Sequence, residues 1–224
     1  MALNASKVPS TGGGKSKQDP IESGNYLARL VQVLDLGLQE QRPYQGKEKP
    51  PAHEIMLTYE LGTEFIKDEE GNPNEEQPRW ISESLPLRPL TQDLAKSTKR
   101  VAVFDPIGAL SGDFAQMVGS PCTVTVVQNP NKKDPTIIYN NVGNVTPAMK
   151  GIPVPDLVNP PKVFDLDEPD LEVFGSLPEW VQEKIKGNLN FNGSLLQRAL
   201  AGDTSKPAAS QPPVENDEED EVWD

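Results

Sequence analysis

Apolar and polar side chains alternate strictly over residues 53–61, "HEIMLTYEL". One side of this segment carries His53, Ile55, Leu57, Tyr59 and Leu61, and the other carries Glu54, Met56, Thr58 and Glu60. A period of two residues is typical of a β-strand with one buried side. The pattern therefore predicts a strand whose aliphatic side faces the core.

An earlier segment, residues 25–39 "NYLARLVQVLDLGLQ", is rich in Leu and Val, but its alternation slips between Leu30 and Val31. Such a slip indicates a β-bulge in a strongly bent strand. The residues that join these two strands, "QRPYQGKEKPP", predict a long basic loop. An acidic loop, "KDEEGNPNEEQP", leads to a third strand, "RWISESL", in which Ile81 and Leu85 face one way and Trp80 the other.

Residues 93–118 show helical spacing broken at Pro106. Two β-branched runs follow, "CTVTVVQ" and "TIIYNNV", with the turn-like "NPNKKDP" between them. The predicted order is three strands, a helix and two strands. An OB-fold, a small, partly open five-stranded barrel that binds oligonucleotides, has this order. A different five-stranded α+β sandwich would give the same order. We expect a mainly β fold with minor α, and an OB-fold-like barrel.

Changes in composition divide the chain into five parts. We expect a disordered arm in residues 1–22, the OB-fold-like domain in 23–150, a proline-rich linker in 151–175, a helical hairpin in 176–202 and a disordered acidic tail in 203–224. The linker is expected to be extended, lying on the domain surface.

The sequence "SLPEWVQEKIKGN" predicts the first helix of the hairpin. Ser176 with Glu179 has the spacing of a capping box, and Gly187 is a stop signal. Trp180, Val181 and Ile185 form its apolar side, and a second helix begins at Ser194. We expect the two helices to pack back on the barrel or on a second copy of the chain.

The net charge of −13 argues at first against nucleic acid as a partner. The acids are concentrated, however: residues 52–78 and residues 203–224 each hold eight acids and one lysine. Residues 1–51 hold seven bases and five acids, and residues 79–150 hold eight bases and five acids. This distribution leaves room for an anion-binding face on the β domain.

A single cysteine, Cys122, and a single histidine, His53, rule out a disulfide framework and a zinc site of His and Cys ligands within the chain. No nucleophile motif is present, so we expect a protein that is not an enzyme and that uses no cofactor or metal. A nuclease that binds magnesium through the acidic loop is the enzymatic alternative. The sequence lacks an apolar membrane span and favours a reducing, cytoplasmic setting.

Single-stranded nucleic acid is bound by basic grooves combined with aromatic faces on which bases stack. The chain offers three aromatic candidates: Trp80 beside Arg79, Tyr44 in the basic loop, and Tyr139 near a lysine pair. The predicted DNA-binding residues are Arg29, Arg42, Tyr44, Lys47, Lys49, Arg79, Trp80, Lys99, Arg100, Lys132, Lys133 and Tyr139. Alternatively, Trp80 and Tyr139 belong to a core whose facing is reversed, and the lysines serve solubility.

The chain ends "PPVENDEEDEVWD", in which six of the seven residues 215–221 are acidic. An exposed aromatic in a polyanion provides an anchor for a pocket, while the acids meet basic residues around its rim. We therefore predict a partner-binding tail formed by Glu218, Glu219, Asp220, Glu221, Val222, Trp223 and Asp224. A solubilising tail that happens to contain a Trp is the alternative.

A β domain followed by an acidic tail with one aromatic near its end resembles the single-stranded-DNA-binding proteins of phage replication, above all those of T7-like phages, and more loosely the bacterial type. "NYLARLVQVLDLGLQ" and "MVGSPCTVTVV" also look like phage proteins encoded beside replication and recombination genes. The likeness covers residues 24–145 in pattern and the last dozen in composition. It departs in having Trp223, followed by Asp224, where the family has a Phe.

The resemblance implies a non-enzymatic protein that coats single-stranded DNA without base specificity, in the cytoplasm of an infected host cell. Its tail would recruit replication or recombination proteins. The alternative from another class is an acidic protein-binding adaptor or DNA mimic that does not itself bind DNA.

Overall fold

The structure, a computed structural model, describes residues 19–68 and 70–203. The predictions for the arm up to residue 18 and for the tail, including Glu218 to Asp224, lie outside the described residues. Among the described residues, no helix is long and apolar enough to cross a membrane.

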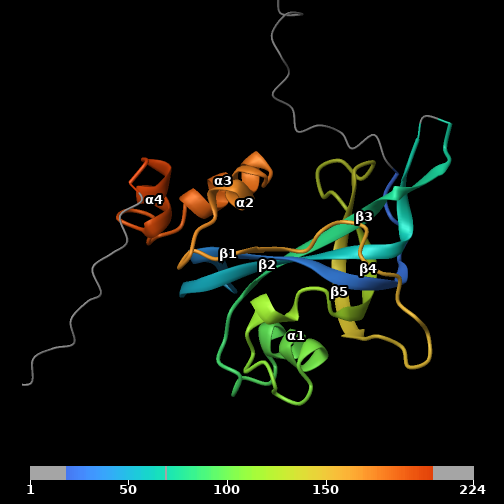
Figure 1. The fold of residues 1–224 in the computed structure, drawn as a ribbon, viewed down its shortest axis with the longest axis horizontal. Coiled ribbons are helices and arrows are strands. Elements are labelled where there is room, and N and C mark those ends of the chain that lie inside the picture. Colours follow the sequence, from blue (N-terminus) through green and yellow to red (C-terminus); the bar gives the residue numbers. More distant parts are fainter. Residues whose placement is uncertain (1–18, 69, 204–224) are drawn as a thin grey trace, which may run out of the picture.

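The described chain is mainly β with short helices, as predicted (Figure 1). Its antiparallel strands are β1 (Gly24–Tyr44), β2 (Lys47–Lys67), β3 (Pro73–Pro86), β4 (Pro121–Pro130) and β5 (Ile138–Pro147). They pair in the order β3-β2-β1-β4-β5, and a short strand, β6 (Lys162–Phe164), pairs with β1 in parallel. The predicted barrel is not closed, because β3 and β5 form no ladder with each other in the described sheet.

The sheet nevertheless curls around one core. Side chains from both edge strands, Ile81 and Leu85 of β3 and Val142 and Val145 of β5, belong to the same buried cluster. This first cluster also contains the predicted inward side of β2: Ile55, Leu57, Tyr59 and Leu61. His53, predicted on that side, is exposed near the strand's beginning.

The predicted bulge is present in β1. Leu30 pairs with Tyr59 and Gln32 pairs with Thr58, so Val31 is the extra residue. The bulge reverses the phase of the strand, as a one-residue insertion must. Leu30 and Val33 therefore both face the first cluster, whereas Leu34 faces the opposite side of the sheet.

The prediction of a long basic loop between the first two strands is wrong. Both strands continue to a two-residue turn at Gln45 and Gly46, where Tyr44 pairs with Lys47. These turn residues have φ of 52° and 75°, and two positive φ values in a two-residue loop match the twist of the flanking strands. The basic residues consequently lie on a projecting hairpin.

The acidic loop is likewise shorter than predicted. Asp68 follows β2, and its Oδ1 accepts hydrogen bonds from the backbone N–H groups of Glu70 and Asn72 at 2.9 and 2.8 Å. These bonds lower the pKa of Asp68. The next strand begins directly afterwards at Pro73.

The predicted helical region between β3 and β4 contains α1 (Lys96–Phe104) and a 3-10 turn, η2 (Phe114–Met117). The predicted break is confirmed, since α1 ends at Phe104 and its C-cap, Asp105, stands immediately before Pro106. The Asp105 carboxylate accepts a hydrogen bond from the backbone of Leu110 at 3.0 Å. Phe104, Phe114 and Met117 belong to the first core cluster. Figure 1 shows α1 below the sheet.

A second core cluster lies on the other face of β1 and β2. It joins Leu34, Leu36 and Met56 of the hairpin to Phe164 and to α2 (Leu171–Gly175), α3 (Glu179–Lys186) and α4 (Leu195–Leu200). Figure 1 shows these helices above the hairpin, opposite α1. The C-terminal helices thus pack back on the β domain, which was one of the two predicted arrangements.

Two details of the helical prediction are wrong. Ser176 ends α2, with its Oγ donating to the Val173 carbonyl at 2.7 Å, and α3 is preceded by Pro178 without a side-chain cap. The capping box is therefore not formed. Val181 and Ile185 are buried as predicted, but Trp180 is 59% exposed. The predicted start of the second helix is confirmed: Ser194 is the N-cap of α4 and accepts a hydrogen bond from the Gln197 N–H.

The first part of the predicted linker lies on the domain surface, as expected, but the rest of it is not extended linker, because it forms β6 and α2 and buries Phe164 and Phe174. We call residues 153–159 the strap. Arg29 holds one end of it through the carbonyls of Val154 and Pro155 and the carboxylate of Asp156. The other end is held by Glu60, which accepts from Val158 and Asn159. Strand β6 follows and pairs with β1 just beyond the bulge.

Candidate nucleic-acid interface

Trp80 faces away from the first core cluster, on the side of β3 that the alternation predicted. Its neighbour Ile81 is buried, whereas Trp80 is 38% exposed. The indole Nε1 donates a hydrogen bond to Glu60 Oε2 at 3.0 Å, across the β2–β3 pair. This bond fixes the orientation of the partly exposed ring, and stacking on a base requires an exposed aromatic ring.

Glu60 is the residue that organises this surface. Glu60 is only 3% exposed. Besides the hydrogen bond from Trp80, its carboxylate accepts hydrogen bonds from the Val158 N–H and from Asn159 Nδ2, both at 2.7 Å. A buried carboxylate is tolerated when charge-bearing oxygens receive several hydrogen bonds. Glu60 therefore ties Trp80 and the strap into one unit.

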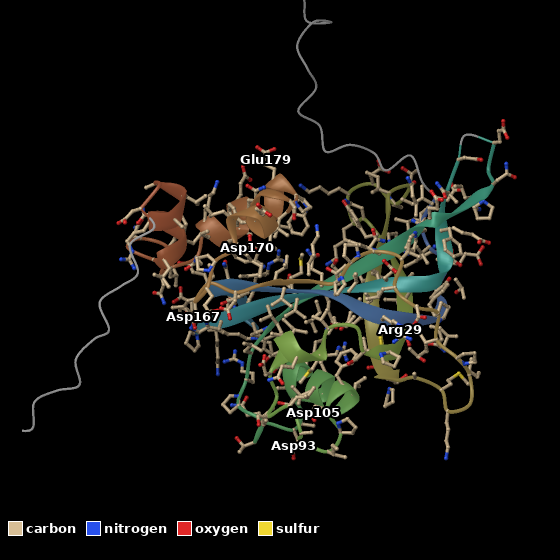
Figure 2. All side chains as sticks on the ribbon, in the orientation of Figure 1. Arg29, Asp93, Asp105, Asp167, Asp170 and Glu179 are labelled. Atoms are coloured by element: carbon tan, nitrogen blue, oxygen red, sulfur yellow. The ribbon has the colours of Figure 1, made fainter. Side chains whose placement is uncertain are left out.

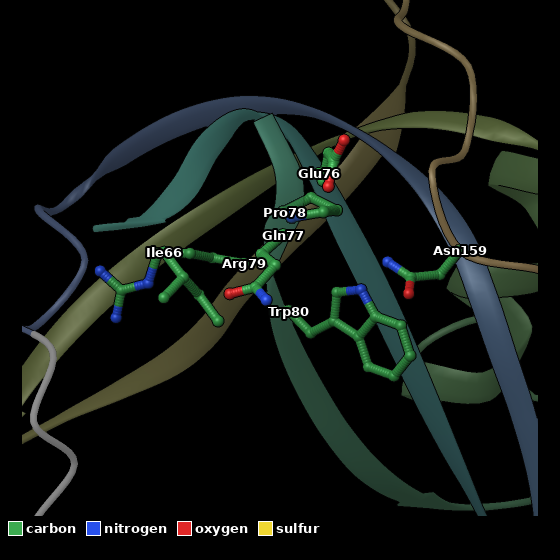
Figure 3. A pocket seen from close by; sticks show the side chains of 7 residues that line it. All are labelled: Ile66, Glu76, Gln77, Pro78, Arg79, Trp80 and Asn159. Carbon is green, nitrogen blue, oxygen red and sulfur yellow. The ribbon is translucent and has the colours of Figure 1, made fainter. Parts of the chain in front are cut away.

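A shallow depression of about 430 Å³ lies over Trp80. Ile66, Glu76, Gln77, Pro78, Arg79, Trp80 and Asn159 line it. Figure 3 shows the Arg79 side chain directed away from the indole, with Asn159 on the opposite side. Arg79 also lines a neighbouring cavity with Glu22, Glu64 and Glu75. The depression thus offers an aromatic face with little positive charge.

The tip of the β1–β2 hairpin gathers a second set of predicted residues. Arg42, Tyr44, Lys47 and Lys49 are all exposed, and Tyr44 and Lys47 are strand partners. The Lys49 ammonium lies 4.9 Å from the centre of the Tyr44 ring, within the range of a cation–π contact. Here an aromatic face and positive charge do coincide.

The β4–β5 hairpin holds the third set, with Lys132 and Lys133 in its loop and Tyr139 in β5. Lys132, Lys133 and Tyr139 are exposed. The Asn131 side chain shapes the loop, because its Oδ1 accepts from the Lys133 N–H at 2.7 Å and its Nδ2 donates to the Tyr139 hydroxyl at 3.0 Å. The loop therefore places a tyrosine close to two cations.

Two of the predicted phosphate ligands already bind other groups of the protein. The Arg29 guanidinium donates to the carbonyls of Gly119, Val154 and Pro155 and pairs with Asp156. Arg100 is 2% exposed and forms a two-bond ion pair with Glu83. Both predictions are corrected, because these charges are already paired. Lys99, the neighbour of Arg100, is exposed on α1.

The three aromatic candidates do not share one cleft. Trp80 pairs with Glu60 and Tyr44 pairs with Lys47, so thirteen residues of β2 separate the two positions. At about 3.3 Å per residue this is roughly 40 Å of strand. A bound strand would meet them at different nucleotides.

No local pattern indicates that Glu60 and Asn159 meet, because they are ninety-nine residues apart in the chain. A partial signal was present: Glu60 lies between the buried Tyr59 and Leu61 and opposite a tryptophan-bearing strand. Within residues 19–68 and 70–203, no group of three or more His, Cys, Asp or Glu side chains is placed to hold a metal ion.

Comparison of this chain with models of protein families, with curated protein sequences and with solved structures finds no match.

Proposed function

We propose that this protein binds single-stranded DNA without base specificity and coats exposed strands. The observation that supports the proposal best is the topology. The order β3-β2-β1-β4-β5, with α1 in the β3–β4 connection, is that of an OB-fold opened between its third and fifth strands. OB-folds bind oligonucleotides with the face of strands 2 and 3 and with the loops after strands 1 and 4.

The uncovered candidate residues occupy these regions. The hairpin tip follows the first strand, the Lys132–Tyr139 segment follows the fourth, and Trp80 lies on the third. Tyr44, Trp80 and Tyr139 would stack on bases, and Arg42, Lys47, Lys49, Lys132 and Lys133 would contact phosphates. Each stacked base contributes roughly 1–3 kcal/mol, independently of its identity.

The outer face of β1 and β2 is unavailable for this role, because the strap and the C-terminal helices cover it. The DNA path would therefore follow β3 and the two basic tips. The acidic tail, by its sequence, would recruit replication or recombination proteins through Trp223 and the flanking acids.

A binding titration tests the proposal. Fluorescent single-stranded and double-stranded oligonucleotides of equal length are titrated at several salt concentrations. The expected result is preference for the single strand, little dependence on base composition, and affinity that falls with salt. Absence of salt-sensitive binding to any single strand would overturn the proposal.

A second candidate, an acidic adaptor or DNA mimic, is favoured by one specific observation. The acid Glu76 lines the Trp80 depression, the Glu60 carboxylate accepts the hydrogen bond of the indole, and the Arg79 side chain is directed away from the indole. A surface of this kind suits a basic protein partner. The same titration separates the two functions, since a mimic would not bind the oligonucleotides.

A further inference from the structure

The side-chain amide of Asn159 has a fixed orientation. Its Nδ2 donates to Glu60 Oε2 at 2.7 Å. Every other hydrogen bond that this carboxylate receives from the described residues also comes from an N–H group. Because the carboxylate acts only as an acceptor, the amide nitrogen must face Glu60 and Oδ1 must point away from it. Oδ1 accepts no hydrogen bond from the described residues and is not one of their buried unpartnered atoms, so Asn159 presents an accessible acceptor to the depression over Trp80.

The indole of Trp80 is held by the same atom. Its Nε1 donates to Glu60 Oε2 at 3.0 Å, so the indole and the Asn159 amide are neighbours at one carboxylate oxygen. Figure 3 shows the amide at the edge of the ring. The strap that carries Asn159 is also fixed at its other end, where Arg29, labelled in Figure 2, donates to two of its backbone carbonyls. Ring and acceptor are thus in place before a ligand arrives, which lowers the entropic cost of binding.

The other residues of the lining add negative charge and no side-chain donor in a fixed position. The carboxylate of Glu76 accepts hydrogen bonds, whereas the exposed amide of Gln77 can turn to donate or to accept. The Arg79 side chain is directed away from the indole. Ile66 and Pro78 are the apolar part of the lining. The depression therefore complements a flat ring that carries N–H donors at its edge and no negative charge of its own.

Nucleobases differ in this respect. Adenine, cytosine and guanine each carry an exocyclic amino group, whereas thymine carries a carbonyl oxygen, O4, and a methyl group. We propose that the Trp80 depression is a subsite that takes an amino-bearing base in preference to thymine, with the base stacked on the indole and its amino group donating to Asn159 Oδ1. The O4 atom of thymine would instead face another acceptor. Glu76 repels phosphate, so the sugar–phosphate backbone lies outside the depression.

The preference rests on the proposed function and narrows it at one position of the bound strand. One base meets Asn159, while the bases at Tyr44 and Tyr139 lie beside tyrosine rings and lysines. A strand of mixed sequence therefore still binds with little dependence on its overall composition. The selectivity comes from a residue of the strap and not from the strands beneath it.

Two free nucleosides that differ at the amino group test the proposal. The pair is 5-methyl-2′-deoxycytidine and thymidine: the first has an amino group where the second has O4, and it lacks the hydrogen on N3. Each nucleoside is titrated into the isotope-labelled full chain. The indole N–H signal of Trp80, identified by its absence in Trp80→Phe, gives the dissociation constant. We expect the amino nucleoside to bind about three- to tenfold more tightly, which is the effect of one hydrogen bond between neutral groups.

Removing the acceptor should remove the preference. In Asn159→Ala the two dissociation constants should lie within about twofold of each other. Both nucleosides should still shift the Trp80 signal in this variant, because the indole keeps its own bond to Glu60. Gln77→Ala is the matched control, since it removes the other amide of the lining and should leave the preference unchanged.

The possible outcomes separate this preference from the proposed function. Equal binding of the two nucleosides, tighter binding of thymidine, or no shift of the Trp80 signal by either nucleoside would overturn the preference. A preference that survives in Asn159→Ala, or that Gln77→Ala abolishes equally, would overturn the role of Asn159, as would loss of all nucleoside binding in Asn159→Ala. Coating of single strands is measured independently, and it falls only if oligonucleotides fail to bind in the salt titration.

Discussion

Arg100 and Glu83 form a two-bond ion pair inside the first core cluster: Nε lies 2.7 Å from Oε1, and the second bond measures 3.1 Å. Their side chains are 3% and 8% exposed. Burial disfavours the charged guanidinium, but the hydrogen bonds and charge of Glu83 outweigh it, so the pKa of Arg100 is raised. The Tyr59 hydroxyl donates to the same carboxylate at 2.9 Å. The pair joins α1 to β3.

Removing one partner of this pair should destabilise the protein strongly. Arg100→Ala leaves the Glu83 carboxylate buried without its counter-ion, which costs about 3–5 kcal/mol. Urea denaturation followed by circular dichroism measures the free energy of unfolding.

The adjacent Lys99→Ala is the control, because Lys99 is exposed and its loss should change that free energy by about 0.5 kcal/mol or less. Arg100→Met combined with Glu83→Leu should recover much of the loss, since a buried ion pair can be replaced by apolar groups. A small cost for Arg100→Ala, equal to that of Lys99→Ala, would mean that the pair is open to solvent.

Cys122 should be inert in the folded protein. It is fully buried, and burial raises the pKa of its thiol to about 12, so almost no thiolate is present at neutral pH. A chromogenic disulfide reagent should therefore react at the rate of unfolding and within seconds in 6 M urea. Fast reaction without denaturant would show that the β1–β4 pairing opens locally.

Gly62→Ala should lift the strap without unfolding the sheet. A Cβ at Gly62 would lie 2.8 Å from Cγ of Pro155, and the rigid proline ring cannot turn away. We expect thermolysin to cleave near Leu157 about tenfold faster, which corresponds to roughly 1.4 kcal/mol. Gly175→Ala is the matched control, since no atom lies within 4 Å of its added Cβ. Equal cleavage rates of the two variants would mean that the strap does not pack against Gly62.

Stacking and phosphate contacts should separate in the DNA titration. Trp80→Ala and Tyr44→Ala should each weaken binding by roughly 1–3 kcal/mol, whereas Lys47→Ala and Lys132→Ala should mainly lower the salt slope by about one. Trp80→Phe distinguishes the ring from its bond to Glu60: it keeps a stacking face but loses the N–H donor. Loss of affinity in Trp80→Ala only in parallel with unfolding would assign Trp80 to stability alone.

The sequence predicted the elements whose signals are local. The alternation around Leu57 and the slip at Val31 were read correctly, because each depends on adjacent residues. The second buried face, on which Leu34 and Met56 pack, depends on residues more than one hundred positions later and left no local signal. The length of the first two strands was also predicted wrongly. The basic residues around Tyr44 have the composition of a loop, but the turn at Gln45 and Gly46 lets both strands continue through them.

The candidate site followed the same rule. The outward facing of Trp80 could be derived from its own strand, and its exposure agrees. The sequence could not distinguish Arg29 and Arg100 from surface cations, because only the folded structure shows whether an arginine faces solvent or pairs with an acid. The acids that pair with these arginines could not be identified from the sequence. Asp156, the partner of Arg29, is far away in the chain, and Glu83, the partner of Arg100, lies on another element.

The β1–β2 hairpin is buried on both faces, and this has a consequence for folding during synthesis. A ribosome completes β2 at Lys67, but the helices that cover Leu34, Leu36 and Met56 end only at Leu200. At roughly 5–20 residues per second, this apolar face of the nascent hairpin stays unprotected for about 7 to 27 seconds. Chaperone contact, or pairing between neighbouring nascent chains, would be concentrated in that interval.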